Sequence, residues 1–571
     1  MSGSQSFWSA VDQVLQKIHL ASIQDEPARE CIRLLLNLVE KLSAELRKAQ
    51  AEILYLRQQP PRRPGGGGQP DPRQDSSPRA QRSSEKERAE PVDPAQPERS
   101  KKRRKLDRIR VDREEVLKLD RALLPPDAQF KGYEDVVVQD LLLRTDNVRF
   151  RKEKYYAAST GRTYLAPLPL GYEGEYGPNL KSLCLVFSHM GNMTEPKIAD
   201  VLGNVGICIS DGQISRLLAR AYEPFQAEKE AIVEAGLSSS PWQHLDDTGT
   251  PVGGRKWHCH VLCNPLYTAY CTTPRKDRLT VIDVLRNQRE RVFRLNEEAL
   301  GLLGALGASK GLVARVRPLA CEQDWPEAEL KRQLAEGLPH LGRWAHGRIL
   351  EAAAIAAYHA QVGYPVVRLL VCDDAKQFKL VTEERALCWV HDGRHYQSLE
   401  PCVPQHRPHL EAFRESYWDY YRQLRAYQRT PTPEWAGQLR AQFDDLFSTV
   451  SGYEGLDERI AKTQANQANL LMVLKHPEIP LHNNSAELGA RQRVRKRVVS
   501  YGPRSDLGVK AWDAMETVIA TAKKLGVSGF QYICDRVSGA RKMPSLAELI
   551  RERAKTLNLG SSWATVSSPT Y

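Results

Sequence analysis

The chain has 571 residues, of which 41% are hydrophobic, and its formal net charge is +12 at pH 7. This length exceeds a single hydrophobic core, so several domains are expected, and the positive charge favours a polyanionic partner. No apolar run could span a bilayer, the eleven cysteines lack the spacing of a disulfide framework, and the first residues lack a signal-peptide pattern. These features predict a protein of the reducing cytoplasm with no membrane partner.

Residues 1–57 are predicted to form an N-terminal helical segment. From Ile32 to Leu56, apolar side chains recur in alternating steps of three and four residues, as in a heptad repeat. The β-branched residues and leucines of this repeat favour a parallel coiled coil, and therefore a homodimer or higher oligomer. An amphipathic helix packed on its own chain is the alternative, because Leu36 and Leu38 widen the apolar stripe.

Residues 58–112 form a linker that is rich in proline, glycine and arginine. Such a composition predicts disorder, because it buries too little apolar surface to offset chain entropy. The linker contains a basic run with Lys102, Arg103 and Arg104. We interpret this run as a phosphate-binding arm, with a nuclear address or a solubilising charge block as alternatives.

Residues 113–175 alternate weakly and predict a small β-containing module, whereas residues 176–235 predict three helices. Ser210 is a candidate N-cap of the third helix, where Gln213 would complete a capping box. Two short helices joined by a glycine-containing turn fit a helix-turn-helix, with Gln213 and Arg216 as DNA contacts. Any compact three-helix bundle would show the same caps, so the DNA-binding interpretation depends partly on net charge.

Residues 236–540 are predicted to form the catalytic domain. Three strand-like segments, a helix and a further buried strand follow one another, and acid pairs occur on the first strand and after the fourth. This order is typical of an α/β, ribonuclease-H-like fold of the retroviral-integrase type, in which the first and fourth strands are adjacent. A long helical stretch at about 287–360 would be an insertion, and residues 541–571 a C-terminal tail.

Asp246 and Asp373 belong to these acid pairs, and a third acid, Glu487, begins a cationic helix. Three carboxylates would suit two hard divalent cations that clamp a phosphodiester for in-line displacement. We expect two Mg²⁺ ions, with Mn²⁺ as a plausible substitute. The candidate DNA contacts on the cationic helix are Arg491, Arg495, Lys496 and Arg497. The alternative is an exposed basic helix with surface ion pairs and no specific contacts.

Several polar side chains flank these acids. Asp247, Asp374 and His391 are candidates for positions around the metal ligands. Cys388, with His391 and His395, has a spacing that could bind zinc. No paired Cys-x-x-Cys accompanies these residues, so a motif beside the active site is the preferred interpretation.

Four motifs resemble those of insertion-sequence family 66 of DDE transposases: HLDDTG at 244–249, VCDDAKQF at 371–378, CWVHDGRHY at 388–396 and HNNSAELGARQRVRKR at 482–497. The most specific piece is Asn-Asn-x-Ala-Glu with an arginine four residues after the glutamate. The resemblance implies that Asp246, Asp373 and Glu487 form the metal-binding triad. It also implies a transposase of the bacterial cytoplasm and nucleoid, which binds the inverted repeats of its element, cuts them and joins them to target DNA.

The chain departs from the family pattern in three respects. Asp247 stands where the family typically has glutamate, which leaves open whether Asp246 or Asp247 binds metal. The spacing between the first two triad acids is longer than expected, and the Cys-rich zinc segment of many members is missing. A ribonuclease-H-like nuclease or resolvase without strand transfer, or a dimeric DNA-binding regulator derived from a transposase, would share much of this sequence.

Overall fold

The computed structural model describes residues 15–18, 20–58, 109–120, 124–125, 128–172, 174–220 and 222–564. The predicted linker lies almost wholly outside these residues, and so do Lys102, Arg103 and Arg104. None of the described helices is long and apolar enough to cross a membrane.

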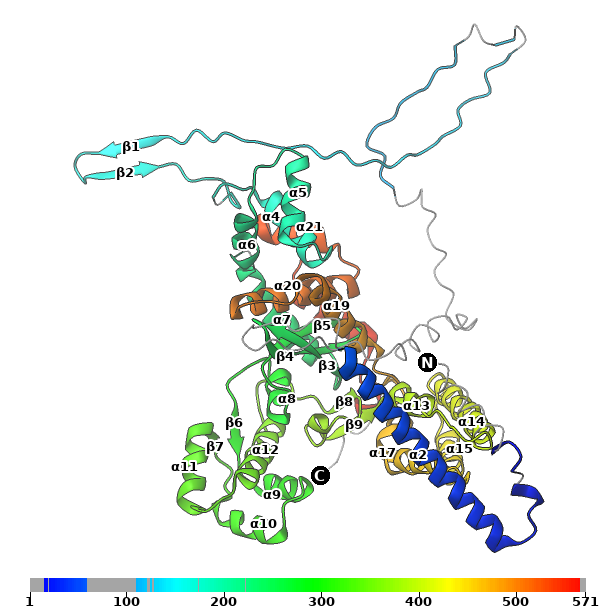
Figure 1. The fold of residues 1–571 in the computed structure, drawn as a ribbon. Coiled ribbons are helices and arrows are strands. Elements are labelled where there is room, and N and C mark those ends of the chain that lie inside the picture. Colours follow the sequence, from blue (N-terminus) through cyan, green and yellow to red (C-terminus); the bar gives the residue numbers. More distant parts are fainter. Residues whose placement is uncertain are drawn as a thin grey trace.

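A five-stranded sheet with the order β5–β4–β3–β8–β9 forms the centre of the molecule (Figure 1). Its strands are β3 (Trp242–Val252), β4 (Arg255–Asn264), β5 (Tyr267–Thr273), β8 (Leu369–Cys372) and β9 (Glu384–Leu387). The first three are antiparallel to one another in chain order, and β8 and β9 run parallel to β3. The first and fourth strands of the sheet are therefore adjacent, as the sequence predicts.

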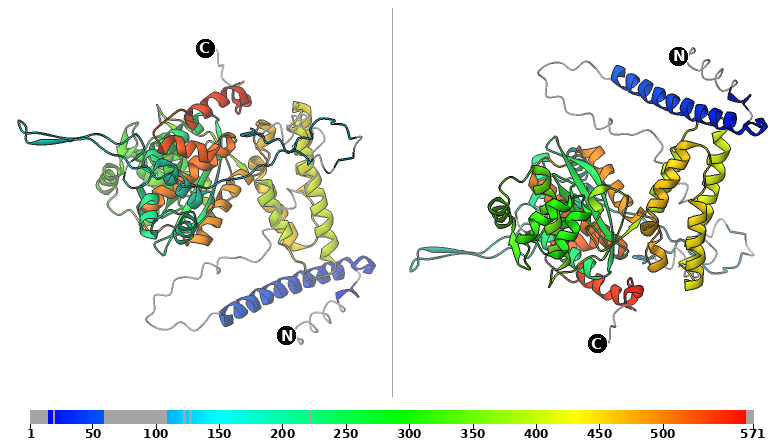
Figure 2. Two further views of the ribbon diagram at one scale, coloured as in Figure 1. Left: turned by 90° about the horizontal axis from the view of Figure 1, so that it is seen from above. Right: turned by 90° about the horizontal axis from the view of Figure 1, so that it is seen from below.

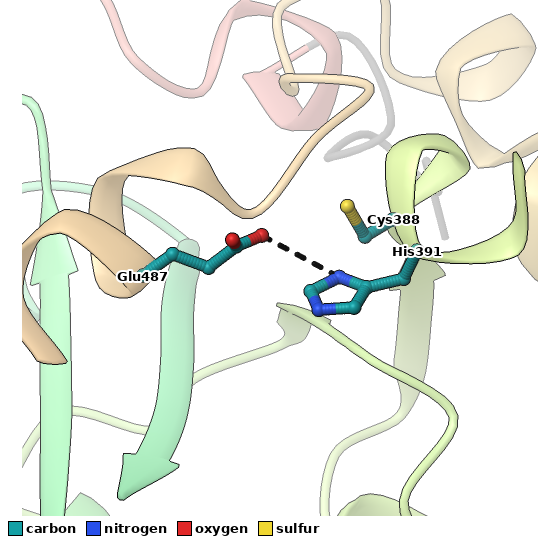
Figure 3. Close-up of side chains that lie close together, drawn as sticks. All are labelled: Cys388, His391 and Glu487. Atoms are coloured by element: carbon teal, nitrogen blue, oxygen red, sulfur yellow. Dashed lines mark ion pairs between the residues drawn. The ribbon is translucent and has the colours of Figure 1, made fainter. Parts of the chain in front are cut away.

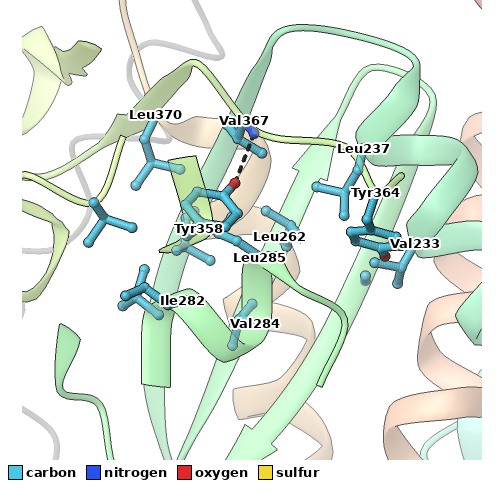
Figure 4. Packing of buried hydrophobic residues seen from close by; sticks show 14 of the residues in the cluster. Val233, Leu237, Leu262, Ile282, Val284, Leu285, Tyr358, Tyr364, Val367 and Leu370 are labelled. Carbon is cyan, nitrogen blue, oxygen red and sulfur yellow. Dashed lines mark hydrogen bonds between the residues drawn. The ribbon is translucent and has the colours of Figure 1, made fainter. Parts of the chain in front are cut away.

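One face of the sheet packs on helices that surround a large apolar core (Figure 4). Leu245, Leu262 and Leu370, from three different strands, are buried there. The helices include α7 (Glu223–Ser238), α8 (Arg278–Leu285) and α12 (Arg343–His359). The backbone N–H of Val367 donates a 2.8 Å hydrogen bond to the hydroxyl of Tyr358, which ties α12 to the chain that enters β8.

The other face of the sheet, which carries Trp242 and Val371, packs on a second, aromatic-rich core. Trp389 is fully buried in this core. The helices that follow β9 are α13 (Trp389–Gln397), α14 (His406–Tyr427), α15 (Pro433–Leu446), α16 (Glu454–Ala465), α17 (Gln467–Leu470) and α18 (Met472–Lys475). The sequence did not reveal this second helical region. Because helices cover both faces, β8 is a continuous apolar run.

The edge strand β5 is closed by helix α20 (Asp506–Lys524). Alternate backbone N–H groups of the strand donate to side-chain oxygens of the helix: Thr268 to Thr521 (3.3 Å), Tyr270 to Thr517 (3.0 Å) and Thr272 to Asp513 (2.7 Å). Four residues of helix and two residues of strand both rise by roughly 6–7 Å, so the two ladders match. The helix thereby covers an edge that could otherwise pair with another chain.

The predicted insertion at 287–360 is mainly helical. It contains α9 (Glu297–Ala305), α10 (Lys310–Val316), α11 (Glu327–Gly337) and α12. A short antiparallel ribbon, β6 (Val292–Arg294) with β7 (Asp324–Pro326), joins these helices.

The N-terminal helix α2 (Glu26–Gln58) lies across one end of the second helical region (Figure 2). Leu36 is only 2% exposed and packs with Val403. The carboxylate of Glu40 accepts hydrogen bonds of 2.6 and 2.8 Å from the backbone N–H groups of Cys402 and Val403. The helix thus packs on its own chain, while the leucines of its other face, Leu35, Leu38, Leu42 and Leu46, are exposed.

The segment 176–235 forms α4 (Pro178–His189), α5 (Glu195–Asn204), α6 (Asp211–Arg220) and α7. A small core of Cys184, Ile198, Leu202 and Ile214 holds the first three together. Before them, β1 (Lys154–Ala157) and β2 (Arg162–Leu165) form a hairpin that extends away from the body (Figure 1). Near the C-terminus, α21 (Gly529–Val537) packs on α4 and α22 (Leu546–Leu557) packs on α7, so the predicted tail contains a helix of the folded body.

Candidate active site

Asp246 and Asp373 are brought together by the pairing of β3 with β8. The parallel register ends with His244 opposite Val371. Asp246 lies two residues further along β3, and Asp373 directly follows β8, close enough for its charge to act on Asp246. Side chains alternate between the two faces of a sheet, so both carboxylates lie on the face that His244 shares with Val371. Two acids that are distant in the sequence are therefore neighbours.

Glu487 reaches the same face from the first turn of α19 (Asn484–Ser500). Ala486 and Ala490 pack on the β4 side chains Cys259 and Val261. A Cβ atom on Gly489 would lie 2.6 Å from Val261 Cγ1, so only glycine permits this approach of helix to strand. Small residues on both sides of the glutamate therefore set the distance between α19 and the sheet.

Asn483 fixes the start of α19 to β3. Its side-chain oxygen lies 2.9 Å from His244 Nδ1, and its side-chain nitrogen donates a 2.9 Å hydrogen bond to the carbonyl of Leu245. The backbone N–H of Asn483 also donates to Cys388 Sγ at 3.2 Å. The sequence marks the Asn-Asn pair only as part of a motif and gives no signal for this role.

The three carboxylates influence one another electrostatically. Burial, together with the negative charges of Asp373 and Glu487, raises the pKa of Asp246 to about 8. Clustered carboxylates cannot all ionise at neutral pH unless a proton or a cation compensates their charge. The cluster therefore has the electrostatic character of a cation site.

The Glu487 carboxylate also contacts two side chains of α13, Arg394 and His391, and Figure 3 shows the contact with His391. Arg394 lies 3.0 Å from one oxygen, and His391 Nδ1 lies 3.6 Å from the other. That second oxygen and His391 Nδ1 are both buried, and neither makes a hydrogen bond with a described residue. Buried polar atoms of this kind are rare unless a water molecule or ligand satisfies them.

Among the described residues, Cys388, His391 and Glu487 are the one group of three whose possible ligand atoms all lie within 4.8 Å of one another (Figure 3); Asp246, Asp373 and Glu487 are not as close together as this in the structure. Burial raises the pKa of the Cys388 thiol to about 12, and its sulfur accepts the hydrogen bond from Asn483. In this role the Cys388 thiol supports the start of α19. Cys388 and His391 flank the acids, whereas His395 is not part of the group.

Asp247 and Asp374 face away from the three acids. Asp247 alternates to the opposite face of β3, where Lys276 (3.0 Å) and Gln377 (2.8 Å) bind its carboxylate. Asp374 is exposed and binds Lys379 and Arg385, each at 3.2 Å. The geometry thus favours Asp246 over Asp247 as the acid that faces Asp373 and Glu487.

The cationic helix divides its charges between two faces. Arg495 is exposed and Arg491 and Arg497 are half-buried, but Lys496 is 3% exposed. Lys496 Nζ binds the carbonyl of Ser188 at 3.2 Å and His189 Nδ1 at 2.5 Å. The expectation that Lys496 contacts DNA is therefore wrong for this conformation, because α19 buries that side against α4 and α20.

The helix-turn-helix candidates differ in their accessibility. The predicted capping box is present, since Gln213 Oε1 accepts from the Ser210 backbone at 3.0 Å and Ser210 Oγ accepts from the Gln213 backbone at 3.3 Å. Gln213 Nε2 in addition donates to Glu175 at 3.2 Å. The amide of Gln213 is thus engaged within the protein, whereas Arg216 is exposed.

Comparisons with known proteins identify the family to which the chain is similar. A family model described as "Transposase IS66 family" matches residues 353–511, which include Asp373, His391 and Glu487. The chain is also 34% identical over 328 residues to an uncharacterized protein, y4jO, of Sinorhizobium fredii (strain NBRC 101917 / NGR234). That match covers 57% of this chain and 100% of the relative. No solved structure matches the chain.

Proposed function

The chain belongs to the IS66 family of transposases, and from this premise we propose that it cuts and joins DNA at the ends of its own mobile element with Asp246, Asp373 and Glu487 as metal ligands. Membership of the family makes it an enzyme that acts on DNA. The observation that carries the finer proposal is the convergence of the three carboxylates, which raises the pKa of Asp246.

The catalytic core is proposed to be ribonuclease-H-like. The sheet order β5–β4–β3–β8–β9, with β4 antiparallel to the other strands, supports this assignment. So do the positions of Asp246 on the first strand of the sheet and Asp373 directly after the fourth.

The residues present fit a pair of divalent cations. Three carboxylates supply oxygen ligands, the kind that Mg²⁺ and Mn²⁺ prefer, and one buried oxygen of Glu487 makes no hydrogen bond with a described residue. Bound Mg²⁺ ions would polarise the scissile phosphodiester and lower the pKa of the attacking water or 3′-hydroxyl. Other residues of the chain would position Glu487. Asn483 and Gly489 hold it close to β3, and Arg394 orients its carboxylate.

DNA is proposed to approach along the side of α19 that carries Arg491, Arg495 and Arg497. These cations follow Glu487 on the same helix, so phosphates bound there would lie next to the acids. Arg216 on α6 and the basic run Lys102–Arg104 are proposed to bind the terminal inverted repeats and the adjoining backbone. The exposed leucines of α2 are proposed to join two copies of the chain.

A strand-transfer assay tests this function. Purified chain, Mg²⁺ and labelled duplexes with the element's ends would be compared with Asp246→Asn, Asp373→Asn and Glu487→Gln. The matched control is Glu336→Gln, which neutralises an exposed acid on α11. Joined products are expected from the unsubstituted chain and the control only, and chelation by EDTA should abolish them.

Other outcomes would replace the proposal. Cleavage without joining would identify a nuclease or resolvase. DNA binding without either reaction, unchanged by the three substitutions, would identify a regulator. Joining that survives Asp246→Asn but not Asp247→Asn would move the metal site to the opposite face of β3.

A further inference from the structure

An open pocket of about 680 Å³ lies where the inserted helices meet the catalytic sheet. The insertion contributes the end of α9, at Ala305–Gly307, and Arg348 of α12. The catalytic domain contributes Arg278 and the segment 376–385 between β8 and β9, and the second helical region contributes Asn469 and Met472. Three parts of the chain thus line one concave surface, and the function proposed above makes no use of it.

Basic side chains dominate the lining of this pocket. Arg278 and Arg348 share one carboxylate, that of Glu351, at 2.5 and 2.6 Å. Lys379 and Arg385 likewise share the carboxylate of Asp374, as described above. In each group two cations face a single anion, so one positive charge stays uncompensated.

Two further features increase this excess. Lys376 is exposed and makes no ion pair with any residue that the structure describes. The two acids of the lining have partners of their own, since Glu383 binds Arg368 at 3.4 Å and Glu384 binds Lys475 and His476. The pocket therefore has an excess of positive charge that favours an anionic ligand.

The pocket is connected to the proposed active site through its own lining. The segment with Lys376 and Lys379 begins three residues after Asp373. Arg278 donates hydrogen bonds to the carbonyls of Lys376 and Lys379 at 2.9 and 2.8 Å, which fixes this segment against α8. Gln377, between the two lysines, binds Asp247 on β3. An anionic chain bound at Lys376 would therefore lie within three residues of Asp373, on the side of β3 that carries Asp247.

We propose that this pocket binds the sugar–phosphate backbone of the DNA substrate beside the scissile phosphate, and that the insertion exists to complete it. Two cation pairs, each on its own carboxylate, fit successive phosphates better than one isolated phosphate ion. The inference rests on the proposed function only in taking DNA as the substrate. It gives the inserted helices a role in holding DNA that is distinct from the reaction.

The test is the salt dependence of DNA binding in the Asp246→Asn background, which removes cleavage from the measurement. The probe is a labelled duplex with one terminal repeat and its flanking DNA. Arg348→Gln with Lys376→Gln removes two pocket charges, and Lys331→Gln with Arg332→Gln removes two charges from the same insertion outside the pocket. Each phosphate contact contributes about −0.9 to the slope of log K against log salt, so the pocket pair should make the slope shallower by about two.

The control pair is expected to leave the slope unchanged, and an unchanged slope for the pocket pair would overturn the proposal. A second measurement is independent of charge: a photo-crosslinking amino acid in place of Leu306 should label DNA close to the cut, whereas one in place of Gln333 should not. If the unsubstituted chain cuts and joins DNA but both pocket measurements are negative, the pocket proposal fails alone. If both are positive and no reaction occurs, the transposition proposal fails and the pocket stands.

Discussion

The side-chain oxygen of Asn483 lies 2.9 Å from Nδ1 of His244, and both residues are buried. Burial lowers the pKa of His244 to about 3, so its ring is neutral and Nδ1–H donates to the amide oxygen. This contact joins the residue before α19 to the strand that carries Asp246. The position of Glu487 relative to Asp246 therefore depends on an asparagine that has no charge and no role in the reaction itself.

Replacing Asn483 with alanine should separate the helix from the strand. The change would leave His244 Nδ1 and the Leu245 carbonyl without partners in a buried site, at a cost of about 1–3 kcal/mol for each group. We expect a lower urea midpoint and a loss of strand transfer larger than the stability change explains. Asn484→Ala is the control, because its buried Oδ1 makes no hydrogen bond with a described residue. Equal effects of the two substitutions on stability would contradict the assignment.

Gly489→Ala should force α19 away from β4. The new methyl group would meet Val261 Cγ1 at 2.6 Å, a contact that overpacks the core by about 1–3 kcal/mol. Because the helix carries Glu487, activity should fall even where the protein remains folded. Gly437→Ala on α15 is the control. Its new methyl group would have no atom within 4 Å, so this substitution should stabilise the chain by about 0.5–1 kcal/mol. Urea denaturation of both variants, followed by strand-transfer assays below the midpoint, distinguishes the two cases.

The docking of α2 should weaken at acid pH. Burial alone would raise the pKa of Glu40, but hydrogen bonds from His406, Cys402 and Val403 outweigh it and leave that pKa below its usual value. A carboxyl group whose pKa is depressed by folding stabilises the native state above its unfolded pKa, near 4.3, and loses that contribution as the pH falls further. At pH 7, Glu40→Ala should cost about 1–3 kcal/mol. The difference between the two proteins in urea midpoint should shrink as the pH falls below about 4, and a constant difference would refute the role of the ionised carboxylate.

Lys496 and Arg495 are adjacent in sequence and should behave differently. Burial lowers the pKa of Lys496 to about 7. Between pH 7 and about 10 the unfolded state therefore binds a proton that the native state lacks, so stability should rise with pH by at most about 1.4 kcal/mol per pH unit. This rise should be absent in Lys496→Met, which should also leave the salt slope of DNA binding unchanged. Arg495→Gln should instead make that slope shallower by about one. If Lys496→Met made the salt dependence of DNA binding shallower, Lys496 would have to contact DNA after all.

These contrasts show which parts of the site a sequence can predict. Asp246 and Asp373 end apolar runs, and a strand order with adjacent first and fourth strands is enough to bring them together. The burial of Lys496 could not be predicted from the sequence. A helix with five cations has no apolar stripe that would indicate which side is buried. The roles of Asn483 and Gly489 depend on contacts with β3 and β4, more than two hundred residues away in the chain.

The same limit applies to α2, where the heptad pattern favoured a coiled coil and left a helix packed on its own chain as the alternative. In the structure part of the predicted seam packs on the chain itself, because Ile32 and Val39 lie against the cluster that contains Leu36 and Val403. Leu36 and Glu40 face the body of the protein, whereas Leu35 and Leu42, on the predicted seam, are 54% and 62% exposed. The periodicity of the sequence identifies the apolar stripe of α2. It does not show which residues of that stripe pack against the rest of the chain.

Self-association through α2 can be tested without disturbing its docking. Leu35 and Leu42 are 54% and 62% exposed and lie on the predicted seam, so arginine at both positions should leave the fold intact while placing charges in a dimer seam. We expect the unsubstituted chain to be a dimer by light scattering and the double variant to be a monomer with an unchanged urea midpoint. Leu117→Arg, at an 87% exposed position outside the helix, is the control and should remain dimeric. A monomeric unsubstituted chain at all concentrations, or a double variant that still dimerises, would show that α2 serves the chain only by packing on it.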